Sequence, residues 1–129
     1  MHHLEDSVKL LGTKTDIMRR LHSYDCFIFP SKSEGFSGAL LEAMFAGLPV
    51  LASDIAANQE LVQHMKTGYL FKTGSIENIT NAMIWFSNNR YTAYSNAFHA
   101  HDHAVKNFDQ ENQAEKFENH LYQLIAGKL

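Results

Sequence analysis

The chain has one cysteine and two prolines among 129 residues, and no apolar stretch that approaches the length of a membrane span. A lone cysteine cannot close an internal disulfide, and Cys26 lies in the apolar run 26–29, which predicts a buried thiol in a reducing compartment. A transmembrane helix needs about 20 apolar residues, and the N-terminus lacks the basic-then-apolar pattern of a signal peptide. We therefore expect a cytoplasmic protein with no integral membrane segment.

Strong charge of one sign is also lacking. Eleven Lys and Arg against fourteen Asp and Glu give a net charge of −3, without the basic run that a phosphate backbone would attract, so no nucleic acid partner is expected. No repeat, low-complexity segment or Pro-rich or Ser-rich linker divides the chain. With 45% apolar and 19% charged residues, residues 1–129 are expected to form a single domain.

Short apolar runs alternate with longer stretches of helical spacing, which is typical of parallel strands joined by helices. The predicted fold class is α/β, with a Rossmann-like parallel sheet, flanking helices and a helical C-terminal third. Strands are expected over 8–11, 26–29, 50–52 and 69–71. Helices are expected after Asp16 and Ser75 as caps, over 38–46 and 58–65, over 91–108, and after Asp109 through 114–124.

The segment 30–44 joins a buried strand to a helix and is the most informative part of the chain. Ligands of open α/β sheets bind beyond the carboxyl ends of the strands, and the free N–H groups of a helix N-terminus favour a phosphate there. Gly35 and Gly38 would let the backbone approach such a ligand closely. The sequence therefore predicts an anion or phosphate site, with an ordinary strand-to-helix turn as the alternative.

Two acidic residues in this segment, Glu34 and Glu42, are eight positions apart. If most of the interval is helical, a rise of ~1.5 Å per residue separates them by roughly 10 to 12 Å. This separation is poorly suited to a general acid and a general base that act on one glycosidic bond, because the two carboxylates of a glycosidase lie about 5 to 10 Å apart. The carboxylates are better suited to accept hydrogen bonds from two hydroxylated parts of one long ligand; the alternative is a solvated, unpaired Glu42.

These residues resemble a known family. The pattern Pro30-Ser31-x-x-Glu34-Gly35-Phe36, then Leu41-Glu42-Ala43-Met44, Gly47-x-Pro49-Val50 and Glu60, is similar to that of the family 4 retaining glycosyltransferases of the GT-B fold, the glycosyl transferases group 1. The likeness continues through Gly68-Tyr69-Leu70-Phe71 and covers nearly the whole chain.

The resemblance implies a C-terminal, nucleotide-sugar-binding domain of an enzyme that transfers a sugar from a nucleoside diphosphate sugar with retention of configuration. Glu34 would be the catalytic residue beside the donor sugar hydroxyls, and Glu42 would hold the ribose. Implied donor-binding residues are Glu34, Gly35, Phe36, Ser37, Gly38, Ala39, Leu40 and Glu42. No metal ion or other cofactor is implied. Glu60 would face the cleft or cap a short helix.

The sequence also departs from the family pattern, with Ser37 and Ala56-Ala57 where relatives commonly have glycines. The family's donor domain begins with two further strands and a diphosphate-clamping Arg and Lys, for which the chain offers no counterpart, and an N-terminal acceptor domain would also be missing. We therefore expect a truncated sheet in which strand 8–11 loses its neighbour. A homo-oligomer or strand exchange is predicted, with relocated strands in a monomer as the alternative.

Two further interpretations stay open for the function. The isolated chain is expected to be inactive, so a non-catalytic folded remnant or oligomerising module is one alternative; a sugar-nucleotide epimerase is another. In the parent enzyme, a place at the inner face of a membrane also stays open. His99 and His103 share a helical face at a spacing that can hold zinc, but a solvated face is favoured and no metal site is predicted.

Overall fold

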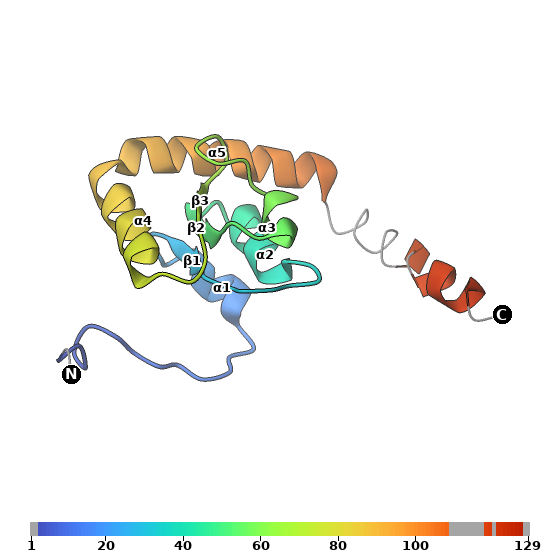
Figure 1. Ribbon diagram of the computed structural model, residues 1–129, viewed down its shortest axis with the longest axis horizontal. Coiled ribbons are helices and arrows are strands. Elements are labelled where there is room, and N and C mark those ends of the chain that lie inside the picture. Colours follow the sequence, from blue (N-terminus) through green and yellow to red (C-terminus); the bar gives the residue numbers. More distant parts are fainter. Residues whose placement is uncertain (1–2, 109–117, 120, 128–129) are drawn as a thin grey trace.

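The computed structural model describes residues 3–108, 118–119 and 121–127. Its elements alternate along the chain, as Figure 1 shows. They are α1 (Ile17–Leu21), β1 (Phe27–Phe29), α2 (Gly38–Phe45), β2 (Val50–Ser53), α3 (Ala56–Gln59), β3 (Tyr69–Phe71), α4 (Ile76–Asn88) and α5 (Arg90–Asn107). The α/β class predicted from the sequence is confirmed.

The three strands form one parallel sheet in the order β1-β2-β3. Phe27 pairs with Val50, and Leu51 pairs with Tyr69, so β2 is the central strand. All four residues of β2 are buried, as expected for a parallel strand that is covered on both faces. Because parallel strands end at the same edge, the segments that follow β1, β2 and β3 lie along one side of the sheet.

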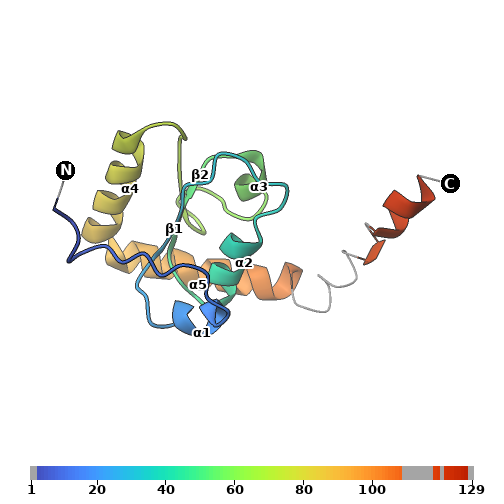
Figure 2. The same ribbon diagram turned by 90° about the horizontal axis from the view of Figure 1, so that it is seen from below.

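Helices cover both faces of this sheet. Val50 and Ala52 pack with α2 and with the second half of α5, whereas Leu51 packs with α4 and the first half of α5. Successive residues of a strand point to opposite faces, so α2 and α4 lie on opposite sides of the sheet. In Figures 1 and 2, α5 extends from the α4 side to the α2 side and contributes to both clusters.

Small residues provide the buried face of α5. Its buried hydrophobic side chains are Ala93, Ala97, Ala100 and Ala104. The aromatic side chains within this helix lie on the outside, with Tyr91 90% and Phe98 71% exposed. The predicted helix is confirmed, and alanines let its backbone approach α2 more closely than aromatic side chains would.

Two sequence-based predictions about the elements are wrong, and a third is confirmed only in part. No strand forms over 8–11, where Leu10 is 97% exposed, because the segment finds no neighbour with which to pair. The helix expected over 58–65 is the single turn of α3, which begins and ends earlier. Asp16 is the N-cap residue of α1, as predicted, but its side chain makes no capping hydrogen bond, and its carboxylate pairs with Arg20 Nε at 3.0 Å.

The other boundaries agree closely with expectation. Ser75 Oγ accepts a hydrogen bond from the Asn78 N–H at 3.4 Å and caps α4 as predicted. Gly47 follows α2 with a φ of 77°, a left-handed conformation in which glycine carries no Cβ penalty. The Asp109 cap and much of the helix expected over 114–124 lie outside the described residues. Within the described part, no helix combines the length and apolar character that crossing a bilayer requires.

Candidate functional site

The segment 30–37 lies at the carboxyl end of β1 and leads directly into α2, as the sequence predicted. Its first polar contact is made by Ser31, whose hydroxyl lies 2.8 Å from Glu34 Oε1 and 3.1 Å from the Ser33 carbonyl oxygen. An ionised carboxylate only accepts hydrogen bonds, so Ser31 is the donor to Glu34. Glu34 is exposed at the surface of the loop, with one oxygen oriented by a neighbour.

The N-terminus of α2 presents backbone amides. Ser37 is the N-cap residue, and its carbonyl oxygen accepts from the Leu41 N–H at 3.1 Å. Its side chain makes no capping hydrogen bond. The N–H groups of the first helical residues, 38–40, have no acceptor within the helix and none elsewhere among the described backbone contacts. These N–H groups, together with the positive end of the helix dipole, can stabilise an anion.

Glu42 lies one turn further along α2, on its exposed face. The residues around it, Leu40, Leu41, Ala43 and Met44, point into the core. Within the described residues the Glu42 carboxylate makes no hydrogen bond or ion pair, so it can accept from a ligand. The Leu40 side chain is fully buried; of this predicted donor-binding residue, only the backbone can face a ligand.

The remaining predicted residues surround this helix terminus. Gly35, Phe36 and Ala39 are exposed and Gly38 is partly buried, whereas Ser37 is buried. No Cβ contact would arise within 4 Å at Gly35 or Gly38, so the space beside these two backbones is open. Glu60 is exposed but is the C-cap of α3, and the prediction that it caps the start of a helix is wrong.

Sequence reasoning missed Ser53 and Asn58. Asn58 Oδ1 accepts from the Ser37 hydroxyl at 2.5 Å, and Asn58 Nδ2 donates to the Ser53 carbonyl oxygen at 2.8 Å. Ser53 Oγ donates in turn to the Ser31 carbonyl oxygen. The signal that could have found them is a serine at the end of an otherwise apolar strand, followed by a short polar run.

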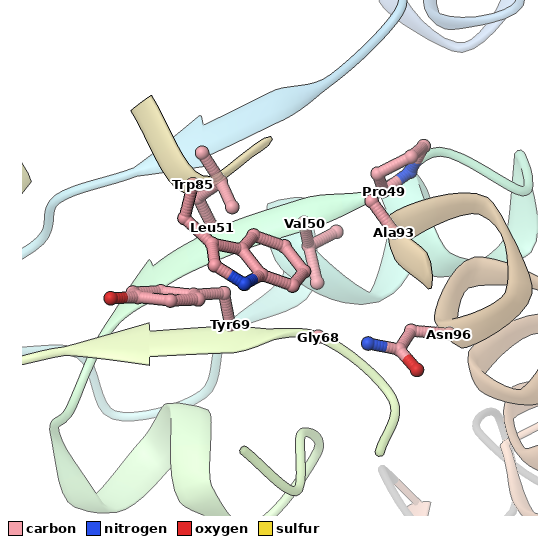
Figure 3. Close-up of a pocket in the computed structure, with 8 residues that line it drawn as sticks. All are labelled: Pro49, Val50, Leu51, Gly68, Tyr69, Trp85, Ala93 and Asn96. Atoms are coloured by element: carbon pink, nitrogen blue, oxygen red, sulfur yellow. The ribbon is translucent and has the colours of Figure 1, made fainter. Parts of the chain in front are cut away.

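A pocket lies at the opposite edge of the sheet (Figure 3). It is lined by Pro49, Val50, Leu51, Gly68, Tyr69, Trp85, Ala93 and Asn96. Pro49 and Gly68 precede β2 and β3, so this pocket is at the amino ends of the strands, away from the segment 30–37. Asn96 is buried, and its Nδ2 has no hydrogen-bond partner among the described residues.

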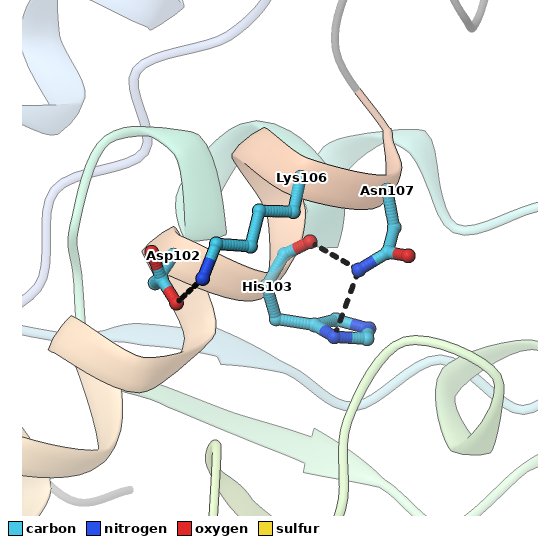
Figure 4. A network of polar contacts seen from close by, with 4 residues as sticks. All are labelled: Asp102, His103, Lys106 and Asn107. Atoms are coloured by element: carbon cyan, nitrogen blue, oxygen red, sulfur yellow. Dashed lines mark hydrogen bonds and ion pairs between the residues drawn. The ribbon is translucent and has the colours of Figure 1, made fainter.

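Two histidines of α5 make polar contacts, one with α2 and one within α5. His101 Nδ1 lies 2.9 Å from the Phe45 carbonyl oxygen. Figure 4 shows Asn107 Nδ2 between the His103 carbonyl oxygen and His103 Nδ1, at 2.9 and 3.2 Å. Next to it, Lys106 Nζ lies 2.9 Å from Asp102 Oδ2, and this hydrogen bond lowers the pKa of Asp102. No group of three metal-ligating side chains gathers in the described part of the chain.

The family Glycosyl transferases group 1 matches residues 1–101. The chain belongs to this family. A relative that is 26% identical over 123 residues is the N-acetyl-alpha-D-glucosaminyl L-malate synthase of Bacillus anthracis, with 95% of this chain and 32% of the relative covered. The UDP-Gal:alpha-D-GlcNAc-diphosphoundecaprenol alpha-1,3-galactosyltransferase of Escherichia coli is 37% identical over 82 residues, with 64% of this chain and 21% of the relative covered.

Solved glycosyltransferase structures show the same fold. Anabaena Alr3699/HepE, in complex with UDP and glucose, superimposes with a TM-score of 0.80 and 30% identity, over 90% of this chain and 33% of that protein. The chain thus spans about a third or less of the length of the three proteins named here. The family is one of glycosyltransferases, and the name of the Escherichia coli relative agrees with it.

Proposed function

We propose that this chain is the donor-binding part of a family 4 retaining glycosyltransferase and binds a nucleoside diphosphate sugar at the N-terminus of α2. The observation that carries the proposal is the open helix N-terminus between two exposed carboxylates, Glu34 and Glu42. The related Anabaena protein is in complex with UDP and glucose, which supports a uridine nucleotide as the first ligand to test.

In this proposal the N–H groups of residues 38–40 face the diphosphate. When the bond between the sugar and the nucleotide breaks, negative charge develops on the leaving diphosphate. Amides that are already oriented stabilise that charge without reorganisation. The side chain of Glu42 accepts hydrogen bonds from the ribose hydroxyls, and Glu34 accepts from the donor sugar beside the reacting carbon. The proposed chemistry assigns no role to a metal ion or other cofactor.

The acceptor site is proposed to lie outside these residues. Because the chain spans only 32% and 21% of the two curated relatives, a partner domain of the parent enzyme would bind the acceptor and complete the cleft. The isolated 129 residues are then expected to bind donor without transferring its sugar. The alternative proposal is a folded module that has lost donor binding and associates with itself; a sugar-nucleotide epimerase is a weaker one.

A titration of the chain with UDP, GDP and ADP, followed by amide chemical-shift changes, tests the proposal. Donor binding predicts saturable shifts that cluster on residues 34–42 and identify the preferred base. The pocket at the amino ends of the strands serves as an internal control, because Gly68 and Asn96 should not shift. Absence of shifts at millimolar concentrations of all three nucleotides would contradict donor binding and favour the folded-module alternative.

A further inference from the structure

A buried polar network lies directly behind the candidate donor site. Ser37 is 1% exposed, and Ser53 and Asn58 are fully buried. Burial of polar groups is costly unless their hydrogen bonds are made. Here each group has a partner: Asn58 accepts from Ser37 and donates to Ser53, and Ser53 donates to the Ser31 carbonyl oxygen. The network thus joins the two ends of the loop 31–37 to β2 and α3.

The hydroxyl of Ser37, the N-cap residue of α2, does not cap the helix. A serine at an N-cap commonly accepts a hydrogen bond from an N–H in the first helical turn, as Ser75 does for α4. Ser37 instead donates its hydroxyl proton to Asn58 Oδ1 at 2.5 Å and makes no capping bond. This hydrogen bond anchors the N-cap residue of α2 to α3, and the Ser37 side chain accepts no hydrogen bond from the amides of residues 38–40.

The start of the loop is anchored through the same asparagine. Asn58 Nδ2 lies 2.8 Å from the Ser53 carbonyl oxygen and 3.2 Å from Ser53 Oγ. Ser53 Oγ can donate only one proton, and it donates it to the Ser31 carbonyl oxygen. Ser31 then orients Glu34 through its own hydroxyl, at 2.8 Å. Both ends of the loop that carries Glu34 are therefore linked to Asn58, the start through Ser53 and the end through Ser37.

We infer that Asn58 is a positioning residue for the donor site: through its hydrogen bond to Ser37 it holds the first turn of α2, whose amides face the diphosphate, and through Ser53 it fixes the loop that carries Glu34. This inference rests on the proposed function. Asn58 is completely buried, so it acts on a ligand through its neighbours and not by contact. Its effect on binding should therefore depend on Ser37.

The test is a double-mutant cycle with Asn58→Ala, Ser37→Ala and the double variant, with the dissociation constant of UDP measured by calorimetry on the full chain. We expect each single substitution to weaken UDP binding by about tenfold. The double variant should bind no more weakly than Asn58→Ala, because both substitutions remove the same hydrogen bond. Unchanged binding in Asn58→Ala, or effects that multiply in the double variant, would overturn the inference.

The matched control is Asn96→Ala, which also removes a buried carboxamide but at the opposite edge of the sheet. It should leave the UDP dissociation constant unchanged, and an equal loss there would show a general folding effect and overturn the positioning role. If Asn58→Ala does not fold, Ser37→Ala decides alone, since it deletes a single hydroxyl: tenfold weaker UDP binding supports the inference, and unchanged binding overturns it.

A wild-type chain that does not bind UDP, GDP or ADP contradicts the proposed function. A double-mutant cycle that fails in a chain that binds UDP contradicts only the inference.

Discussion

Gly68 lies so close to Val50 that a Cβ atom placed on the glycine would be 2.6 Å from Val50 Cγ2. The same Cβ would lie 2.9 Å from Val62 Cγ1 and 3.2 Å from the Val50 carbonyl oxygen. Gly68→Ala should therefore force β3 away from β2 and lower the free energy of unfolding by about 1 to 3 kcal/mol, as overpacking in a core does. Denaturant unfolding followed by circular dichroism measures the change.

The control for this prediction is Gly35→Ala. A Cβ at Gly35 would meet nothing within 4 Å, and the residue does not have a left-handed φ. Its free energy of unfolding should stay the same or rise by roughly 0.4 to 1 kcal/mol, because alanine restricts the unfolded chain. Equal destabilisation by the two substitutions would show that close packing at Gly68 is not the cause.

Removal of the Glu42 carboxylate tests the proposed ribose contact. Glu42→Ala should weaken binding of a nucleoside diphosphate by about 1 to 3 kcal/mol, measured by the same titration as the wild-type chain. Glu77→Ala is the control, because Glu77 is an exposed acid in the first turn of another helix, α4. An unchanged affinity in Glu42→Ala, with the control also unchanged, would remove Glu42 from the site.

The thiol of Cys26 should be a poor nucleophile. Burial raises its pKa to about 12 from a usual value of 9.0, so the folded protein keeps the thiol neutral at pH 9, where an unfolded chain begins to ionise it. Because the pKa of the thiol is higher in the folded than in the unfolded chain, its contribution to the free energy of unfolding is fully present below pH 9. That contribution is lost as the pH rises from 9 to 12, where only the unfolded chain ionises readily.

Two measurements check this expectation. Iodoacetamide at pH 8.5 should alkylate Cys26 slowly in the native chain and rapidly in denaturant. In Cys26→Ala, the fall in unfolding free energy between pH 9 and 12 should be smaller than in the wild type. Cys26 is partly buried where the sequence predicted a buried thiol, and native alkylation as fast as that of a small free thiol would contradict even this partial burial.

The edge of β1 tests the predicted self-association. Among the described strands, β1 pairs only with β2, and Ile28 is partly exposed on it. Unpaired strand edges recruit other strands, so sedimentation velocity should show concentration-dependent assembly that Ile28→Lys abolishes. Ile84→Lys, on the exposed face of α4, should leave assembly intact. A wild-type chain that sediments as a monomer at all concentrations would favour the monomer alternative.

Local sequence signals were sufficient for most of the sheet. β1, β2 and β3 are short apolar runs bounded by Pro30, Gly47 and Gly68, so pattern and turn chemistry agree. The segment 8–11 has an equally good strand pattern but no partner strand. Strand formation depends on a neighbour, which a local pattern cannot supply.

The candidate site was predictable where the chemistry lies in consecutive residues. Glu34, Gly38 and Glu42 are at one loop and one helix terminus, as their spacing indicated. Asn58 escaped detection because its hydrogen bond to Ser37 joins residues 21 positions apart. Likewise, helical periodicity located α5 but did not identify its core face, because the alanines bury completely while larger aromatic residues stay outside.

The alanine face of α5 has an entropic consequence. An alanine side chain has no rotamers to lose on burial, whereas a leucine or isoleucine loses about 0.5 to 1 kcal/mol of conformational freedom. Contact between α5 and α2 through Ala100 and Ala104 therefore orders the backbone without ordering side chains. The position of the helix is set by how closely two backbones can approach, and the scaffold behind the segment 30–37 can stay rigid while the outer face of α5 changes in sequence.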